Sequence, residues 1–149
     1  MSYCQSIHHI VFRTYRSEPT IDIQSERDFY GYLYTVATHY HAKVFRIGGM
    51  PDHVHLLVSL PSSLSVSSFM QTIKTVTSKW LKDNPAFPHF RGWAHEYAAL
   101  SYSIKEVPTI VNYISNQKEH HKRFDFSSEL RALLVENGIE IDDKFWLQD

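Results

Sequence analysis

The chain has 149 residues and a mass of 17.5 kDa, the size of a single domain with a substantial core. Hydrophobic residues make up 43% and aromatic residues 14%, which is typical of a globular protein and excludes a disordered chain. One cysteine, Cys4, excludes an internal disulfide, and neither a leader segment nor a long apolar run predicts export or membrane insertion. We therefore expect a cytoplasmic protein that does not bind membranes.

The charge balance also limits the function. Fifteen Lys and Arg against sixteen Asp and Glu give a net charge of −1, whereas proteins that neutralise nucleic-acid phosphates are usually basic. Binding to nucleic acid would therefore depend on local patches. The chain has ten histidines, a residue type that serves both as metal ligand and as acid or base near neutral pH.

In the first half of the chain, β-branched and alternating segments predict strands, and apolar residues at helical spacing predict helices. Strands are expected at 7–15, 43–47 and 53–60, with Gly48-Gly49 ending the second. Helices are expected at 26–42 and 66–82, the latter with Ser65 as N-cap.

In the second half, the aromatic segment 93–105 predicts one long strand or a pair. Pro108 suits the first turn of a helix that runs to about 123, and Ser127 is the expected cap of a last helix that stops at Gly138. The order of elements predicts an α+β fold, a ferredoxin-like split βαβ antiparallel sheet with helices on one face. We expect a single domain over 1–149, with a C-terminal helical extension at about 125–149.

The first candidate site lies on the strand His53–Leu60. Because side chains alternate across a strand, every second residue from Val54 to Leu60 faces the core, and all of these are apolar. His53 and His55 then project from the opposite face with Cα atoms about 7 Å apart. Two imidazoles at this spacing can chelate a divalent cation and leave coordination positions open for catalysis. The alternative is a pair of polar residues on a solvent-facing side of the sheet.

The second candidate site lies on the helix predicted after Pro108. Tyr113 and Gln117 are four residues apart and therefore share one helix face, beside an apolar stripe that would dock the helix on the sheet. If the amide oxygen of Gln117 reaches the cation, Tyr113 is carried to its edge. A nearby cation favours the phenolate, which makes Tyr113 the candidate nucleophile. The alternative is an ordinary amphipathic tyrosine beside a surface glutamine.

Together these residues resemble the HUH-type single-tyrosine transposases of small insertion sequences, over nearly the whole chain. Pro51–Leu57 (Pro-Asp-His-Val-His-Leu-Leu) is similar to the histidine–hydrophobic–histidine motif of that family. Tyr113–Gln117 (Tyr-Ile-Ser-Asn-Gln), followed by Glu119-His120-His121, is similar to its tyrosine motif. The tract from Glu129 to Trp146 is similar to its C-terminal region.

The resemblance implies an enzyme that nicks and rejoins single-stranded DNA through a 5′-phosphotyrosine and recognises DNA hairpins. In that family the cation is Mg²⁺ or Mn²⁺, and its ligands correspond here to His53, His55 and Gln117, with Tyr113 as the nucleophile. The resemblance also implies a homodimer, in which composite active sites can take the tyrosine helix from the partner. It places the protein in the bacterial cytoplasm, close to the nucleoid.

Contacts with DNA phosphates are expected from basic residues on the two helices that follow the histidine strand: Lys74, Lys79, Lys82, Lys118, Lys122 and Arg123. For the first three, a solvated helix face is an equal alternative. Relatives often carry Trp-Gln-x-Gly-Tyr before the last strand, where this chain has Trp93-Ala94-His95-Glu96-Tyr97. This departure bears on DNA contacts near that strand and leaves the metal ligands and the nucleophile untouched.

Two other functions stay open from the sequence. One is a relative adopted by its host that acts on repeated chromosomal hairpins with the same chemistry. The other is a module that binds DNA hairpins and has lost cleavage. A covalent protein–DNA adduct separates the enzyme from the binding module.

Overall fold

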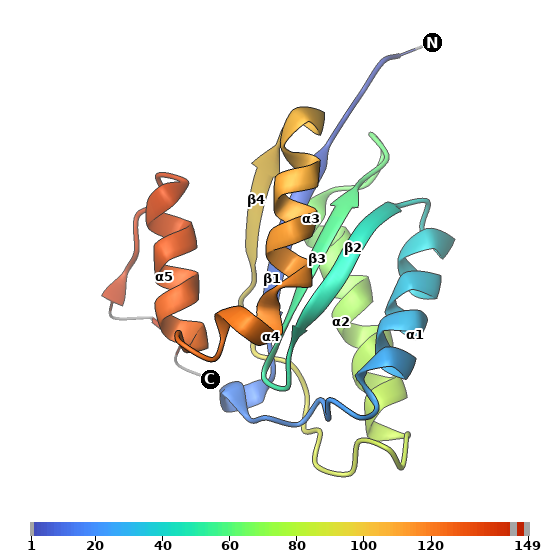
Figure 1. The fold of residues 1–149 in the computed structure, drawn as a ribbon. Helices are drawn as coiled ribbons and strands as arrows, with labels where there is room; N and C mark the ends of the chain where they lie inside the picture. Colours follow the sequence, from blue (N-terminus) through green and yellow to red (C-terminus); the bar gives the residue numbers. More distant parts are fainter. Residues whose placement is uncertain (1, 144–145, 148–149) are drawn as a thin grey trace.

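A computed structural model describes residues 2–143 and 146–147 of the chain (Figure 1). The described residues form a four-stranded antiparallel sheet in the order β2-β3-β1-β4. The strands are β1 (Ile7–Arg13), β2 (Lys43–Met50), β3 (His53–Ser59) and β4 (Ala98–Tyr102). The helices are α1 (Glu26–His39), α2 (Val66–Lys82), α3 (Val107–Ser115), α4 (Gln117–His120) and α5 (Phe126–Glu136). The predicted α+β class with a split βαβ sheet is confirmed.

The two faces of the sheet carry different helices (Figure 1). On β1, Ile10 and Phe12 belong to the main core with α1 and α2, while Ile7 and Val11 pack towards the C-terminal helices. Alternation along one strand therefore supplies apolar side chains to both layers. The helices α1 and α2 share one face as expected, and α3 to α5 cover the opposite one.

The strand β3 lies in the interior of the sheet, between β2 and β1. Its alternate residues Val54, Leu56 and Val58 are fully buried in the main core, as the alternation predicts. His53 and His55 therefore face the C-terminal helices, and both have 0% exposure. Hydrogen-bonded neighbours on both sides fix the strand, so the two imidazoles start from a rigid backbone.

The predicted end of the second strand at Gly48-Gly49 is wrong, because β2 continues to Met50. These glycines sit where the backbone of another element approaches closely. A Cβ on Gly48 would lie 2.7 Å from Cγ2 and 2.9 Å from the carbonyl oxygen of Ile114 in α3. Gly49 has a φ of +155°, and a Cβ there would lie 2.2 Å from the carbonyl oxygen of His53. Both glycines let α3 and the β2–β3 turn pack tightly beside the histidine strand.

We expect Gly48→Ala to destabilise the fold by about 1–3 kcal/mol, because the added methyl group forces α3 away from β2. The matched control is Gly31→Ala in α1, where, apart from the local helix backbone, no atom of the described residues lies within 4 Å of the new Cβ. That substitution is expected to be neutral or to stabilise by about 0.4–1 kcal/mol. Urea unfolding followed by circular dichroism measures both. Equal stabilities of the two variants would contradict the close approach of α3.

The helices of the C-terminal half differ from the prediction in two places. The helix expected from Pro108 to about 123 is interrupted at Asn116, whose φ of −98° and ψ of 16° separate α3 from α4. The last helix is capped by Asp125, which accepts a hydrogen bond from the Ser128 amide at 2.8 Å, and not by Ser127. The earlier start places Phe126 in the helix and buries it.

The last strand and the C-terminal tract are also shorter than expected. Within 93–105, the strand β4 covers only Ala98–Tyr102, and Trp93 forms an isolated bridge with Thr14. A helical extension is expected at 125–149, but apart from short turns the described residues are helical only as far as Glu136. Residues 144–145 and 148–149 lie outside the described residues. Among the described residues, each helix is too short or too polar to cross a bilayer.

Candidate functional site

The ring nitrogens of the two strand histidines point at one place. The Nδ1 atom of His53 lies 2.7 Å from Asp52 Oδ1, and the Nδ1 atom of His55 lies 2.7 Å from Nε2 of His9. Because each Nδ1 is held by a partner, each Nε2 is aimed away from the strand. Both Nε2 atoms lie 3.2 Å from the same oxygen, Oε1 of Glu129. Metal-binding histidines commonly have one ring nitrogen fixed in this way.

The two histidines have opposite electrostatic environments. Burial alone would lower the pKa of His53, but hydrogen bonds with Asp52 and Glu129 outweigh it and raise that pKa to about 9. Burial lowers the pKa of His55 to about 4, and the neighbouring His53 adds to the effect. The surroundings therefore favour the charged form of His53 and disfavour the charged form of His55.

Tyr113 and Gln117 meet at the same place despite the break between α3 and α4. The amide oxygen of Gln117 lies 3.1 Å from Nε2 of His53, and its amide nitrogen donates to Glu129 Oε2 at 2.7 Å. The hydroxyl of Tyr113 donates a hydrogen bond to the same Oε2. Burial first, and this hydrogen bond second, raise the pKa of the Tyr113 phenol. The structure thus brings together the four residues that the sequence singles out: His53, His55, Tyr113 and Gln117.

Sequence reasoning missed Glu129, which lies at the centre of the site on α5 and is 4% exposed. A signal for it exists in the sequence. Glu129 stands three residues after Phe126 and four before Leu133, so it lies on the buried face of an amphipathic helix. A buried carboxylate needs charged or hydrogen-bonding partners.

His9 has no predicted role either, although its place among apolar residues is a similar signal. It lies between Ile7 and Val11 on the buried side of β1, has 0% exposure, and stacks on His55 with ring centroids 5.0 Å apart. Burial first, and the neighbouring His55 second, lower the pKa of His9 to about 3, so it is neutral. A neutral His9 can serve as either donor or acceptor to His55, which adapts it to orient that ring. Asp52, the partner of His53, follows Pro51, and this Pro-Asp pair predicts only a turn.

The donor atoms of the site fit a divalent cation. Ligands held about 2.1 Å from one ion lie about 3 Å apart when they are adjacent. The spacing of 3.1 Å between His53 Nε2 and Gln117 Oε1 matches this value. Ligand atoms of His53, His55 and Glu129 all lie within 4.8 Å of one another. Imidazole nitrogens with carboxylate and amide oxygens form a mixed set that suits Mn²⁺ and related ions.

The basic residues expected to contact DNA fall into two groups. Lys74 donates to the carbonyl oxygens of Ala94 and His95, each at 2.7 Å, and Lys118 donates to the Gly49 carbonyl oxygen at 2.6 Å and to Glu26 at 3.0 Å. These two ammonium groups therefore connect segments of the chain that are distant in the sequence.

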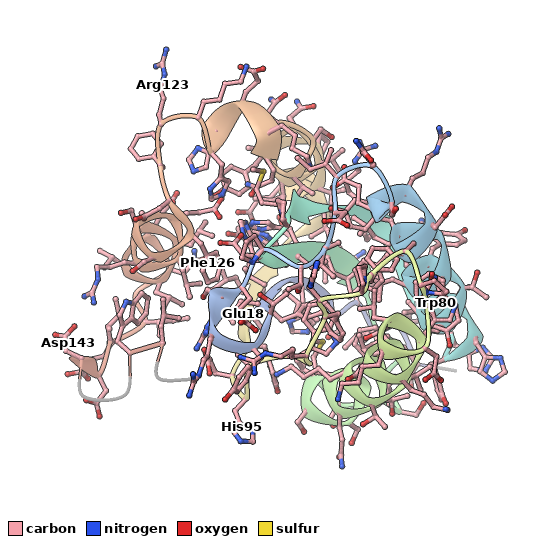
Figure 2. All side chains as sticks on the ribbon, turned by 90° about the horizontal axis from the view of Figure 1, so that it is seen from below. Glu18, Trp80, His95, Arg123, Phe126 and Asp143 are labelled. Atoms are coloured by element: carbon pink, nitrogen blue, oxygen red, sulfur yellow. The ribbon has the colours of Figure 1, made fainter. Side chains whose placement is uncertain are left out.

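The other four cationic side chains are exposed: Lys79, Lys82, Lys122 and Arg123. Lys79 pairs with Asp83, and Lys122 pairs with Glu119. Arg123 extends outward from the loop between α4 and α5 (Figure 2).

The unusual Glu96 has a partner inside the fold. It pairs with Arg13 at 2.6 Å, and Arg13 is only 2% exposed. A buried guanidinium without a counter-charge is strongly unfavourable, so Glu96 stabilises this end of β1. The glutamate at this position of the motif, where relatives often have Gly, thus has a structural explanation in this chain.

The sequence matches one family model and two known proteins. The sequence model of the family described as "Transposase IS200 like" matches residues 2–117. The transposases for insertion sequence element IS200 of Salmonella typhimurium and Salmonella typhi are each 32% identical over 75 residues, which are 48% of this chain and 49% of each relative. The match to this chain thus spans about half the length of these relatives.

Two solved structures share the fold. One, assigned to a transposase from Deinococcus radiodurans R1, has a TM-score of 0.59 and 21% identity over 78% of this chain and 93% of that chain. The other is a REP-associated tyrosine transposase bound to a REP hairpin, with a TM-score of 0.61 and 14% identity over 81% of this chain and 72% of that chain. The family match covers both strand histidines, the tyrosine and the glutamine, and on this ground the chain belongs to the IS200-like transposases.

Proposed function

We propose that this protein nicks and rejoins single-stranded DNA, with Tyr113 as the nucleophile and His53, His55 and Gln117 as ligands of a divalent cation. The observation that carries the proposal is the convergence of these four side chains at one buried place. His53, His55 and Gln117 are fully or almost fully buried, whereas Tyr113 is only partly buried. Tyr113 is thus the most exposed of the four side chains.

A bound divalent cation would polarise a phosphate oxygen and favour the phenolate form of Tyr113. The chain itself supplies the orientation. The partners Asp52 and His9 hold the two imidazole rings, and Gln117 presents its amide oxygen to the same side. The Tyr113 hydroxyl lies in the same cluster, where it donates a hydrogen bond to Glu129.

The reaction would be a direct displacement at phosphorus. The Tyr113 oxygen forms a bond to the phosphorus, the bond to the 3′-oxygen breaks, and the leaving strand ends in a 3′-hydroxyl that takes up a proton. The product is a 5′-phosphotyrosine. The phosphotyrosine ester keeps the bond energy of the broken DNA ester. Attack by another 3′-hydroxyl can therefore restore a DNA strand and release the tyrosine without ATP.

A folded DNA hairpin is the substrate that we propose. The support is the neighbouring structure of a REP-associated transposase, which is bound to a REP hairpin. The exposed Lys122 and Arg123 lie next to the site and offer phosphate contacts. The homodimer implied by the resemblance stays a prediction.

The decisive experiment incubates the purified protein with labelled single-stranded hairpin DNA in Mg²⁺ or Mn²⁺, with EDTA as control. We expect a protein–DNA adduct that survives denaturation, together with a free 3′-hydroxyl, in the presence of the cation only. Substrates would carry the hairpins found beside copies of the gene. Tight binding without adduct on such DNA would contradict the enzyme and support the hairpin-binding module.

A further inference from the structure

The carboxylate of Glu129 reaches the site from a part of the chain outside the family match. That match ends at residue 117, whereas Glu129 lies on α5. The helix docks through the buried apolar residues Phe126, Leu130 and Leu133, which pack with Val11 and Leu100 of the sheet. Figure 2 labels Phe126 where α5 meets the rest of the fold, and its ring lies 4.4 Å from the ring of His53.

The two oxygens of Glu129 face different groups. Oε1 lies 3.2 Å from Nε2 of both His53 and His55, and 2.9 Å from Nε2 of His121. Oε2 accepts hydrogen bonds from the Tyr113 hydroxyl and from the amide nitrogen of Gln117. One carboxylate thus joins the histidine ligands to the nucleophile and fixes which way the Gln117 amide is turned.

A simple ion pair explains only part of this arrangement. One protonated imidazole would suffice to balance the carboxylate, yet three imidazole nitrogens converge on Oε1. His53 and His55 already have Nδ1 partners, so their Nε2 atoms are held towards Oε1 by groups other than Glu129. Two imidazoles and one carboxylate on one side of an ion, with further positions open, form a recurrent metal-binding arrangement.

We propose that the Glu129 carboxylate is a ligand of the cation, supplied by α5, and that cation binding fastens this C-terminal helix to the sheet. The inference rests on the metal site of the proposed function and adds a fourth protein ligand to it. Because a ligand that binds only the docked arrangement stabilises it, the cation would lower the frequency at which α5 opens. The domain and its C-terminal helix would then be coupled through one ion.

The test uses the full-length protein and Mn²⁺ as the probe, with free Mn²⁺ measured by electron paramagnetic resonance. We expect Glu129→Gln to raise the Kd for Mn²⁺ by at least about tenfold, because even partners that only orient a ligand cost 10–100-fold when removed. The matched control is Glu136→Gln, an exposed carboxylate on the same helix, which should leave the Kd within about twofold of wild type. Circular dichroism of each variant checks the fold.

A second measurement needs no variant. In the wild-type protein, Mn²⁺ should slow amide hydrogen exchange across α5 as well as at β3. Slowing at β3 alone would overturn the coupling of α5 to the cation. A Glu129→Gln Kd within twofold of wild type would overturn the ligand role. His55→Ala is titrated in parallel. If His55→Ala loses Mn²⁺ binding while Glu129→Gln keeps it, the ligand role of Glu129 is wrong and the proposed histidine site stands.

Discussion

Tyr113→Phe should form no covalent adduct with hairpin DNA, while its Kd for Mn²⁺ stays within about twofold of wild type. Phenylalanine keeps the ring that packs beside His9 and His55 but lacks the oxygen that would attack phosphorus. Removal of a covalent nucleophile costs orders of magnitude in rate, so we expect a loss of at least about 1,000-fold. Gel electrophoresis under denaturing conditions measures the adduct.

The control for this substitution is Tyr34→Phe, which removes one hydroxyl from a side chain that is 52% exposed on α1. It should form adduct at the wild-type rate. The fold of Tyr113→Phe is expected to survive, since Gln117 still donates to Oε2 of Glu129. An adduct that persists in Tyr113→Phe would move the nucleophile elsewhere, and Tyr102, whose ring centroid lies 6.4 Å from that of His9, would be tested next.

His53→Ala and His55→Ala should each weaken Mn²⁺ binding by at least about 100-fold and abolish the adduct, because each removes a nitrogen ligand outright. His89→Ala is the matched control, since it removes an exposed imidazole from the loop after α2. Isothermal titration with Mn²⁺ measures the affinity. Unchanged affinity in both histidine variants would show that the cation, if bound, sits elsewhere.

These variants also separate chemistry from folding. Both imidazoles are fully buried, so each alanine leaves a cavity and an unpaired partner, Asp52 or His9. We expect the metal-free variants to be less stable than wild type but folded. Thermal unfolding without metal therefore belongs beside each titration, and the loss of affinity is interpreted only for folded protein.

Local periodicity predicted most of the fold. The helix α2 spans Val66–Lys82 with Ser65 as its cap, as expected, because seventeen residues of amphipathic pattern leave little ambiguity. The alternation along β3 correctly assigned which residues face the main core. The same alternation placed His53 and His55 on the opposite face of β3. Tyr113 and Gln117 were expected on one helix and stand on two, α3 and α4, although their side chains still meet.

The remaining features depend on contacts between distant segments. Glu129 lies 74 residues from His55 in the sequence, so no local pattern links the two. The strand β2 continues through its glycines because Gly48 and Gly49 pair with His55 and Val54 of β3, which a local turn signal does not reveal. Asp125 and Ser127 are both good helix caps, and the burial of Phe126 favours the earlier one.

The internal use of Lys74 and Lys118 has a consequence for how this protein would discriminate among nucleic acids. Both ammonium groups are already surrounded by protein oxygens, and the net charge of the chain is −1. A bound strand would therefore displace fewer condensed counterions than the six candidate cations of the sequence suggest, and the dependence of binding on ionic strength would be correspondingly weaker. Such a surface would bind ordinary duplex DNA weakly. Selectivity for a folded DNA strand would then come from the shape of the strand and from its unpaired bases.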